Sequence, residues 1–381
     1  MARICLVAHF AFGAMKDGSE GHSGGVERQT TITARWLAQR GHEVSLVTWD
    51  EGQEDGLFID GVRMLKLCRH DEGLPGLRFF HPRWTSLNQA LRRADAELYY
   101  QNCGEYVTGQ VAWWCRRRGR RFVYSVASDP ECDPRLPEMR TSRERILYRY
   151  GLMRAARVIV QTRKQQRMLK EGFGLEAVVL PMPCPGPAEV ELDPSSGDSS
   201  GTFCVAWVGR IARVKRLEVL LDAAEKLPDV RFDVAGEPDA GEGYTRPLLE
   251  KARAMGNVTL HGHISRDRMP GFYQMASVLC CTSDYEGFPN TFLEAWSYGL
   301  PIVSTVDPDN LISERGLGVF ATNRIQLVQA IQRLKEDNEL RRSMSSNARN
   351  YYLENHAVDP AMRRFEAVFA DALTQRERVN P

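Results

Sequence analysis

The sequence lacks the long apolar run that a membrane-spanning protein needs. No window of its 381 residues approaches the roughly 20 consecutive apolar residues of a spanning helix. The N-terminus enters a strand-like apolar pattern directly, without the charged lead, apolar region and cleavage site of a signal peptide. These absences predict a cytoplasmic protein.

Patterns for disulfides and metal ions are also missing. None of the nine cysteines forms a Cys-x-x-Cys pair, and the adjacent Cys280 and Cys281 lie inside an apolar run. This usage predicts reduced, mostly buried thiols and neither a disulfide framework nor a zinc site. Carboxylates and histidines are not clustered as metal ligands either, so we expect no metal ion and no cofactor.

Composition and length indicate a globular protein of two domains. Apolar residues make up 43% of the chain and charged residues 26%, and 381 residues exceed what one core usually organises. The net charge is +7 over residues 1–183 and −6 over the remainder. Between Arg140 and Lys170 ten basic residues face a single acid, Glu144, which predicts an anionic partner for the first half.

Strand patterns alternate with helix patterns in both halves, which predicts α/β domains with doubly wound parallel sheets. The helices expected most clearly are Val26–Gln39, Leu217–Lys226 and one from about Asn290. The expected strands are Ile4–Phe10, Val44–Trp49, Leu98–Gln101, Phe122–Ala127, Val158–Thr162 and Val178–Leu180 in the first half, and Phe203–Val208, Val230–Ala235, Val258–His261, Ser277–Thr282 and Ile302–Thr305 in the second.

A stretch rich in Pro, Ser and Gly separates the halves and predicts a hinge at 184–202. The first domain is then expected at 1–183 and the second at 203–360. A C-terminal helix is expected at 361–381, where it could pack back on the first domain.

The glycine pair Gly24-Gly25 lies between the first expected strand and the first expected helix. Backbone amides at a helix start attract anions, and glycine lets a ligand approach the main chain closely. A plain tight turn explains such a pair equally well. The dinucleotide-binding pattern Gly-x-Gly-x-x-Gly is absent.

A basic motif follows the first strand of the second half. Gly209-Arg210 comes directly after that strand, and Lys215 stands at a helix entrance. An Arg fork and a Lys charge beyond the carboxyl end of a parallel strand suit a diphosphate leaving group. Because Arg213 and Arg216 stand beside them, a solvated basic loop is the alternative.

Two acids, Glu286 and Glu294, enclose the segment Gly-Phe-Pro-Asn-Thr-Phe-Leu at a strand–loop–helix junction. Eight helical steps would span roughly 12 Å. Paired carboxylates of a glycoside hydrolase are about 5–9.5 Å apart, so the spacing argues against hydrolysis. It better suits two acids that hold different parts of one extended donor.

With these motifs the chain resembles the retaining glycosyltransferases of family 4, which have the GT-B fold of two Rossmann-like domains facing across a cleft. The resemblance covers nearly the whole chain and includes Arg40–Val44 and Ala295. It implies transfer of a sugar from a nucleotide-diphosphate sugar to an acceptor hydroxyl, with retention of the anomeric configuration. Polysaccharide, glycolipid or other glycoconjugate biosynthesis is the implied setting.

The resemblance also implies the donor site. Arg210 and Lys215 would grip the pyrophosphate, Glu294 would bond the ribose hydroxyls, and Glu286 would lie near the transferred sugar. The expected donor-binding residues are Gly24, Gly25, Arg210, Lys215, Glu286, Gly287, Phe288, Pro289, Asn290 and Glu294. The expected catalytic residues are Glu286, Arg210, Lys215 and Asp129.

Two segments depart from the family pattern. Ala127 takes a position where the family often has His, and Asp129 is the nearest polar replacement able to bond a sugar hydroxyl. An ordinary turn of Asp129 into Pro130 is an equally good interpretation. The stretch Asp307–Leu311 replaces the usual Gly-rich segment.

On the acceptor side, Gln101 and Asn102 end a strand and are expected to face the cleft. His9 and His22 can face it too, although structural or solvated roles are more common for such histidines. The partners expected are a nucleotide-sugar donor and an acceptor of unknown identity, with no nucleic acid.

The basic stretch Arg140–Lys170 leaves two interpretations open: a solvated helix face, or a surface that rests on anionic lipid beside a lipid-linked acceptor. Two other functions also remain open. The same architecture supports a nucleotide-sugar epimerase, and Ala127 motivates a catalytically impaired nucleotide-sugar-binding protein.

Overall fold

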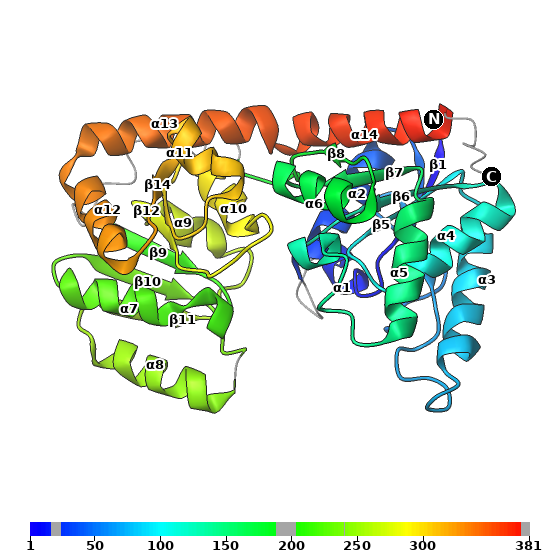
Figure 1. The fold of residues 1–381 in the computed structure, drawn as a ribbon, viewed down its shortest axis with the longest axis horizontal. Coiled ribbons are helices and arrows are strands. Elements are labelled where there is room, and N and C mark those ends of the chain that lie inside the picture. The colour runs from blue at the N-terminus through cyan, green and yellow to red at the C-terminus, as the bar shows by residue number, and fades with distance from the viewer. Residues whose placement is uncertain (17–23, 188–202, 240, 375–381) are drawn as a thin grey trace. The chain divides into compact units, whose positions relative to one another are not determined.

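The chain folds into two compact α/β units (Figure 1). The computed structural model describes residues 1–16, 24–187, 203–239 and 241–374. The first unit contains Met1–Pro183 together with Val358–Pro381, and the second contains Cys184–Ala357. Residues 188–202, most of the expected hinge at 184–202, lie outside the described residues.

The first unit is built on an eight-stranded sheet in the order β3-β4-β2-β1-β5-β6-β7-β8. All neighbouring strands are parallel except β3 and β4, which confirms the predicted parallel sheet. The strands are β1 (Arg3–Val7), β2 (Glu43–Thr48), β3 (Phe58–Ile59), β4 (Val62–Lys66), β5 (Leu98–Asn102), β6 (Arg121–Ser125), β7 (Arg157–Val160) and β8 (Val178–Val179).

Helices cover both faces of this sheet, because successive residues of its strands point to opposite sides. Tyr99 of β5 packs against Trp114 of α4, with ring centroids 4.9 Å apart. Its neighbour Tyr100 packs against Phe369 of α14, at 5.3 Å. The helices are α1 (Phe12–Met15), α2 (Gly25–Gln39), α3 (Thr85–Ala94), α4 (Tyr106–Arg118), α5 (Ser142–Arg154), α6 (Arg163–Phe173) and α14 (Val358–Thr374).

Helices α4 and α5 cross closely because glycines meet the facing backbone. A Cβ atom on Gly109 would lie 2.2 Å from the carbonyl oxygen of Leu147. A Cβ atom on Gly151 would lie 2.5 Å from the carbonyl oxygen of Thr108. This crossing fixes α5 beside the strand ends that carry the cavity described below.

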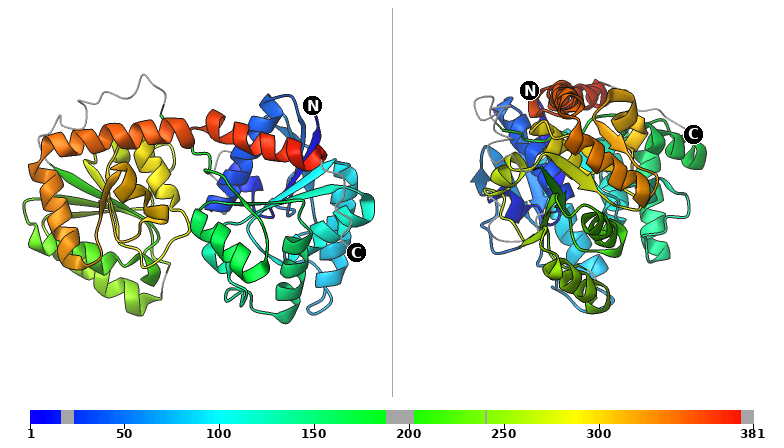
Figure 2. Two further views of the ribbon diagram at one scale, coloured as in Figure 1. Left: turned by 45° about the horizontal axis from the view of Figure 1, so that its top comes forward. Right: turned by 90° about the vertical axis from the view of Figure 1, so that its left-hand side faces the viewer.

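The second unit has a six-stranded parallel sheet in the order β11-β10-β9-β12-β13-β14. Figure 2 shows the ribbon from two further sides. Its strands are β9 (Cys204–Val208), β10 (Arg231–Ala235), β11 (Val258–Gly262), β12 (Val278–Cys281), β13 (Ile302–Ser304) and β14 (Gly318–Phe320). Its helices are α7 (Leu217–Lys226), α8 (Glu242–Ala254), α9 (Met269–Gln274), α10 (Asn290–Ser297), α11 (Leu311–Arg315), α12 (Arg324–Glu336) and α13 (Asn338–Asn355).

The strand order of each sheet reverses once. In the first unit, the chain moves outward from β1 through β2 to β4 and then returns to β5 on the other side of β1. In the second unit, it moves from β9 outward to β11 and returns to β12. Open parallel sheets bind ligands beyond the carboxyl ends of strands at such reversals.

No helix in the described ranges combines the length and the apolar composition needed to cross a bilayer.

Candidate functional site

The motifs Gly209-Arg210 and Glu286 meet at the reversal point of the second sheet. β9 and β12 are neighbours there, and Gly209-Arg210 follows β9 while Ser283 to Glu286 follow β12. Lys215 ends the short turn Arg213–Lys215 that leads into α7. The structure therefore brings together three of the residues that the sequence singled out.

Lys215 and Glu286 form an ion pair that is mostly shielded from solvent. The Nζ atom of Lys215 contacts Oε1 of Glu286, and the two side chains are 25% and 16% exposed. The hydroxyl of Ser283 donates to the same oxygen at 2.6 Å. Thr282 fixes the lysine backbone, since its hydroxyl donates to the Lys215 carbonyl at 2.7 Å.

Two further cations near this pair also have acidic partners. Arg210 contacts Asp239 and is well exposed. The guanidinium of Arg216 lies 2.7 Å from Asp284. The exposed guanidinium of Arg210 can therefore exchange its carboxylate partner for a phosphate, which also presents two oxygens and a negative charge to the arginine.

A close backbone approach supports the Gly209 loop. Gly236 has a φ of +151°, and a Cβ atom on it would lie 1.8 Å from the carbonyl oxygen of Gly209. Glycine is therefore required at 236. The contact holds the loop after β9 against the end of β10.

Glu294 lies on α10, the helix that begins after Pro289. The hydroxyl of Tyr273 donates to Oε2 of Glu294 at 2.7 Å. The Tyr273 ring stacks on Tyr298, with centroids 5.5 Å apart. This contact orients the carboxylate, and no local sequence pattern links Tyr273 to Glu294.

The rest of the Glu286–Glu294 segment leads into α10. Phe288 packs on Trp296 and His356, with ring centroids 6.1 and 5.5 Å away. Asn290 is the first residue of the helix. With Phe288 anchored in this way, the backbone from Gly287 to Asn290 passes from the loop after β12 into α10.

The segment Asp307–Leu311 keeps the backbone conformation that glycine favours, without glycine. Asp309 and Asn310 have φ values of +51° and +59°. Asp307 stabilises this turn, because its carboxylate accepts from the amides of Ile312 and Ser313.

The remaining predicted donor residues, Gly24 and Gly25, belong to the first unit. Gly24 precedes α2 as its N-terminal cap and is exposed. A Cβ atom on Gly24 would lie 2.4 Å from Oε2 of Glu27, so this acid folds back over the helix start. An anion bound there would first have to displace that carboxylate.

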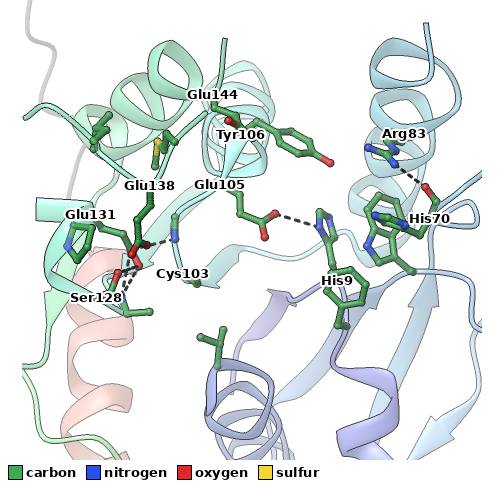
Figure 3. A pocket seen from close by; sticks show the side chains of 18 residues that line it. His9, His70, Arg83, Cys103, Glu105, Tyr106, Ser128, Glu131, Glu138 and Glu144 are labelled. Carbon is green, nitrogen blue, oxygen red and sulfur yellow. Dashed lines mark hydrogen bonds and ion pairs between the residues drawn. The ribbon is translucent and has the colours of Figure 1, made fainter. Parts of the chain in front are cut away.

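A cavity of about 540 Å³ lies at the reversal point of the first sheet (Figure 3). Its lining comes from segments that follow the carboxyl ends of the parallel strands, together with α2 and α5. The lining residues are His9, Phe10, Val26, Trp49, His70, Arg83, Cys103, Gly104, Glu105, Tyr106, Ala127, Ser128, Pro130, Glu131, Leu136, Glu138, Met139 and Glu144.

The residues predicted on the acceptor side do not line this cavity. Gln101 and Asn102 are each only 4% exposed. Within the described residues, the side-chain oxygens of both are buried without a hydrogen-bond partner. The chain enters the cavity lining only at Cys103, so contact of Gln101 and Asn102 with an acceptor stays a prediction.

The carboxylate of Asp129 contacts side chains of α6 rather than the cavity. It lies 2.6 Å from Nζ of Lys164 and accepts from Nε2 of Gln165 at 3.1 Å. It is also absent from the cavity lining, although its neighbours Ser128 and Pro130 belong to it. The geometry favours the structural interpretation of Asp129, which ties the turn after β6 to α6.

Glu131 is the buried carboxyl beside Ala127. It accepts from the amides of Gly104 and Ala127, and from the hydroxyls of Tyr124 and Ser128. Burial raises the pKa of Glu131 to about 7, although these hydrogen bonds lower it. Glu131 was not predicted as a site residue, because the sequence marks it only by its place in the turn after β6.

The pair of His9 and Glu105 was missed as well. The Nδ1 atom of His9 lies 3.5 Å from Oε2 of Glu105. Each residue follows a strand, but only the pairing of β1 with β5 shows that the two are neighbours. His22, the other histidine considered, lies outside the described residues.

Comparisons with known proteins cover both units. Residues 191–351 match the family described as Glycosyl transferases group 1, and residues 24–184 match the Glycosyl transferase 4-like domain. The D-inositol 3-phosphate glycosyltransferase of Rhodococcus erythropolis is 27% identical over 340 residues, covering 80% of this chain and 74% of that protein. The same-named protein of Mycobacterium sp. (strain JLS) is 30% identical over 319 residues, covering 74% and 70%.

Solved structures share the fold at low sequence identity. Sucrose-phosphate synthase from Thermosynechococcus elongatus has a TM-score of 0.76 at 19% identity, covering 97% of this chain and 99% of that one. A structure from E. coli bound with UDP-2-fluoro glucose has a TM-score of 0.71 at 13% identity, covering 99% and 100%. The chain belongs to the family 4 glycosyltransferases with the GT-B fold, in which group 1 glycosyl transferase and 4-like domains are joined.

Proposed function

We propose that this glycosyltransferase moves a sugar from a nucleotide-diphosphate sugar to an acceptor hydroxyl and retains the anomeric configuration. The observation that carries the proposal is the Lys215–Glu286 pair at the reversal point of the second sheet, beside Arg210. A cation in that position suits the charge that develops on a departing diphosphate. The E. coli structure bound with UDP-2-fluoro glucose supports this class of donor.

In this proposal, different residues of the second unit bind different parts of the donor. Arg210 and Lys215 bind the diphosphate, and Glu286 positions the sugar while holding the lysine. Glu294, oriented by Tyr273, accepts hydrogen bonds from the ribose hydroxyls. The amides of Gly287 to Asn290 line the sugar and phosphate, as expected for a helix start.

The proposed step needs no enzyme nucleophile. The acceptor oxygen forms the new bond to the sugar carbon from the side that the nucleotide leaves, through an oxocarbenium-like state. The bond between sugar and phosphate breaks with its electron pair on the diphosphate, which then takes the hydroxyl proton. Arg210 and Lys215 carry the diphosphate charge without a metal ion, so we expect chelation by EDTA to leave turnover unchanged.

A lipid-linked acceptor at an anionic membrane is part of the proposal, and α5 supports it. Ile146 and Met153 are 66% and 52% exposed on this helix, and Arg149 is exposed between them. Apolar and basic side chains on one exposed face suit the interface of an anionic bilayer. A glycoconjugate pathway would then supply the acceptor.

A thermal-shift titration against nucleoside diphosphates, followed by a transfer assay, tests the proposal. A ligand at 100 times its dissociation constant stabilises the folded state by about 2.7 kcal/mol. We expect one or more diphosphates to raise the melting temperature, and transfer to yield a product with the donor's anomeric configuration. An inverted product would contradict retention, and conversion of the donor without any acceptor would indicate an epimerase.

A further inference from the structure

The cavity of the first unit contains a histidine–carboxylate pair that the proposed donor chemistry leaves unused. His9 lies two residues beyond β1, and Glu105 lies three residues beyond β5. Because Val7 pairs with Gln101 in this register, the two side chains enter the cavity from adjacent strands. Nδ1 of His9 is 3.5 Å from Oε2 of Glu105 (Figure 3).

The His9 ring is held in one orientation by its surroundings. Its centroid is 4.3 Å from that of Trp49, with an angle of 32° between the planes. The His9 side chain is only 7% exposed. Nδ1 faces Glu105, and Nε2 has no hydrogen-bond partner in the part of the chain that the structure describes, although the residue lines the cavity.

Glu105 determines which ring nitrogen carries the proton. Burial raises the pKa of this carboxyl, but the hydrogen bond from His9 and the charges of His9 and His70 outweigh burial, so the pKa is lower than usual. An ionised carboxylate can only accept a hydrogen bond, so it favours the tautomer of the neutral His9 ring that carries the proton on Nδ1. Nε2 is then a bare acceptor inside the cavity.

The charges around His9 disfavour an anionic ligand. Besides Glu105, the lining includes the carboxyls of Glu131, Glu138 and Glu144, but only one permanent cation, Arg83. The guanidinium of Arg83 donates to a backbone carbonyl at 2.6 Å and lies over the Trp49 ring. Acidic side chains and a bare imidazole nitrogen suit hydroxyl donors.

Two other ionisable side chains of the cavity lining, His70 and Tyr106, also give the cavity no positive charge. Burial and the charge of Arg83 lower the pKa of His70, which keeps that ring neutral at pH 7. Burial and the charge of Glu105 raise the pKa of Tyr106, which keeps its hydroxyl protonated. Neither side chain adds a positive charge that could hold a phosphate or carboxylate.

We propose that this cavity binds the uncharged, hydroxyl-bearing part of the acceptor, and that Nε2 of His9 accepts a hydrogen bond from one of its hydroxyls, other than the one whose proton passes to the diphosphate. The inference rests on the proposed function, because only a transferase has an acceptor. Glu105 is a positioning residue that keeps the proton on Nδ1. The basic surface of the first unit can still attract an anionic group of the same acceptor outside the cavity.

NMR of the full-length protein with ¹⁵N-labelled histidine rings tests the proposal without an activity assay. We expect His9, assigned by loss of its signals in His9→Gln, to carry its proton on Nδ1 at pH 7.5. Glucose or N-acetylglucosamine should shift the Nε2 signal, and their 6-phosphates should shift it far less. The proposal would be overturned by a proton on Nε2, by no shift of the Nε2 signal with either neutral sugar, or by an equal shift with the sugar 6-phosphates.

A positioning role for Glu105 predicts a second, separate result. Glu105→Gln should remove the preference for the Nδ1 proton and weaken binding of the responding sugar roughly tenfold or more, as for loss of a hydrogen bond to a charged group. The matched control is Asp233→Asn, which alters a second His–carboxylate pair, that of His261 at 3.2 Å in the other unit. An unchanged His9 tautomer in Glu105→Gln would contradict this role.

The two proposals fail in different ways. If nucleoside diphosphates do not stabilise the wild-type protein, the proposed function is wrong, whereas the NMR titration still decides what the cavity binds. If transfer occurs and the acceptor KM is unchanged in both His9→Gln and Glu105→Gln, the cavity assignment is wrong and the donor chemistry stands. Melting temperatures of both variants, compared with wild type, exclude misfolding as the cause of a loss.

Discussion

Three basic side chains near the proposed donor phosphates are held by carboxylates. Arg210 contacts Asp239, Lys215 contacts Glu286, and Arg216 contacts Asp284. An incoming diphosphate can replace Asp239 at the exposed Arg210, whereas the shielded Lys215 keeps Glu286 beside it. The exposed pair contributes little to stability, so its exchange costs little.

Glu294→Gln is predicted to lower nucleotide affinity roughly tenfold to a hundredfold. The change keeps the volume and the bond from Tyr273 but removes charge-assisted bonds to ribose hydroxyls, worth about 1.5–3 kcal/mol. Calorimetric titration with the nucleoside diphosphate that stabilises the wild type measures the loss. Glu250→Gln on α8, which alters an exposed pair with Arg246, is the control. Equal affinities in the two variants would remove Glu294 from the site.

Arg210→Ala and Lys215→Ala should reduce turnover more than ground-state donor binding. The diphosphate gains charge only as the sugar–phosphate bond breaks, so a leaving-group role affects kcat most. Donor dissociation constants and single-turnover rates separate the two effects, with Arg246→Ala as an exposed control on α8. Parallel losses in binding and rate would leave simple anion capture as the role of these residues.

Glu131 should make the protein less stable as pH rises. Its pKa is raised from 4.5 to about 7 by burial, so the folded state binds more protons than the unfolded state between these values. The free energy of unfolding must then fall with rising pH in that window, by up to about 1.4 kcal/mol per pH unit. Urea unfolding from pH 4.5 to 8 measures this slope, and Glu131→Gln should flatten it. A slope unchanged by the substitution would show that other groups cause it.

At the scale of elements, the proposed donor site and the cavity both lie beyond the carboxyl ends of parallel strands. Residues after β9 and β12 form the proposed donor site, and residues after β1, β5 and β6 form much of the cavity. The central strands β1, β5 and β9 are almost entirely buried and serve packing. Helix α5, which contributes Glu144 to the cavity lining, also presents the exposed apolar side chains of Ile146 and Met153.

Helix α5 should bind anionic vesicles in a salt-dependent way. Each basic residue near an anionic surface contributes about 1 kcal/mol, and the attraction weakens as the Debye length shortens. Co-sedimentation with anionic and neutral vesicles at low and high salt measures it, and Ile146→Ser with Met153→Ser should reduce it. The control is Ile325→Ser on α12, which removes an equally exposed apolar side chain. Negligible sedimentation with both vesicle types at low salt would make α5 an ordinary solvated face.

At the scale of the whole molecule, the last helix that the structure describes belongs to the first unit. Helix α14 packs on α2, β5 and β6 through the buried residues Met362, Phe365 and Phe369. The chain therefore enters the second unit and returns before it ends. Each unit keeps its own core, so damage to one core should leave the other folded.

Phe369→Ala is predicted to destabilise the first unit by about 3–5 kcal/mol, the usual cost of truncating a buried Phe. Nucleotide binding by the second unit should persist, because none of the proposed contacts of Arg210, Lys215 or Glu294 involves α14. Urea unfolding followed by circular dichroism, with nucleotide binding measured alongside, tests both statements. Arg363→Ala, on the exposed face of α14, should leave stability nearly unchanged. Loss of nucleotide binding together with the first unit would show that the units unfold as one.

Much of the fold could be predicted because its signals are local. The apolar runs of β1 and β9 and the pattern of α7 identify their own segments, since a buried strand or an amphipathic helix needs a fixed apolar spacing. Strands β3, β4 and β14 were not predicted. β3 and β14 have two and three residues, so they depend on a neighbouring strand rather than on a pattern of their own.

The sequence by itself determined the two α/β units and the motif residues Arg210, Lys215, Glu286 and Glu294, because each lies within a few residues of a recognisable strand end or helix start. Tertiary structure alone decided which side chains meet. The pairing of β1 with β5 brings His9 to Glu105, and packing of α9 against α10 brings a tyrosine to Glu294. Strand register and helix packing join residues far apart in the chain, and no local spacing encodes those contacts.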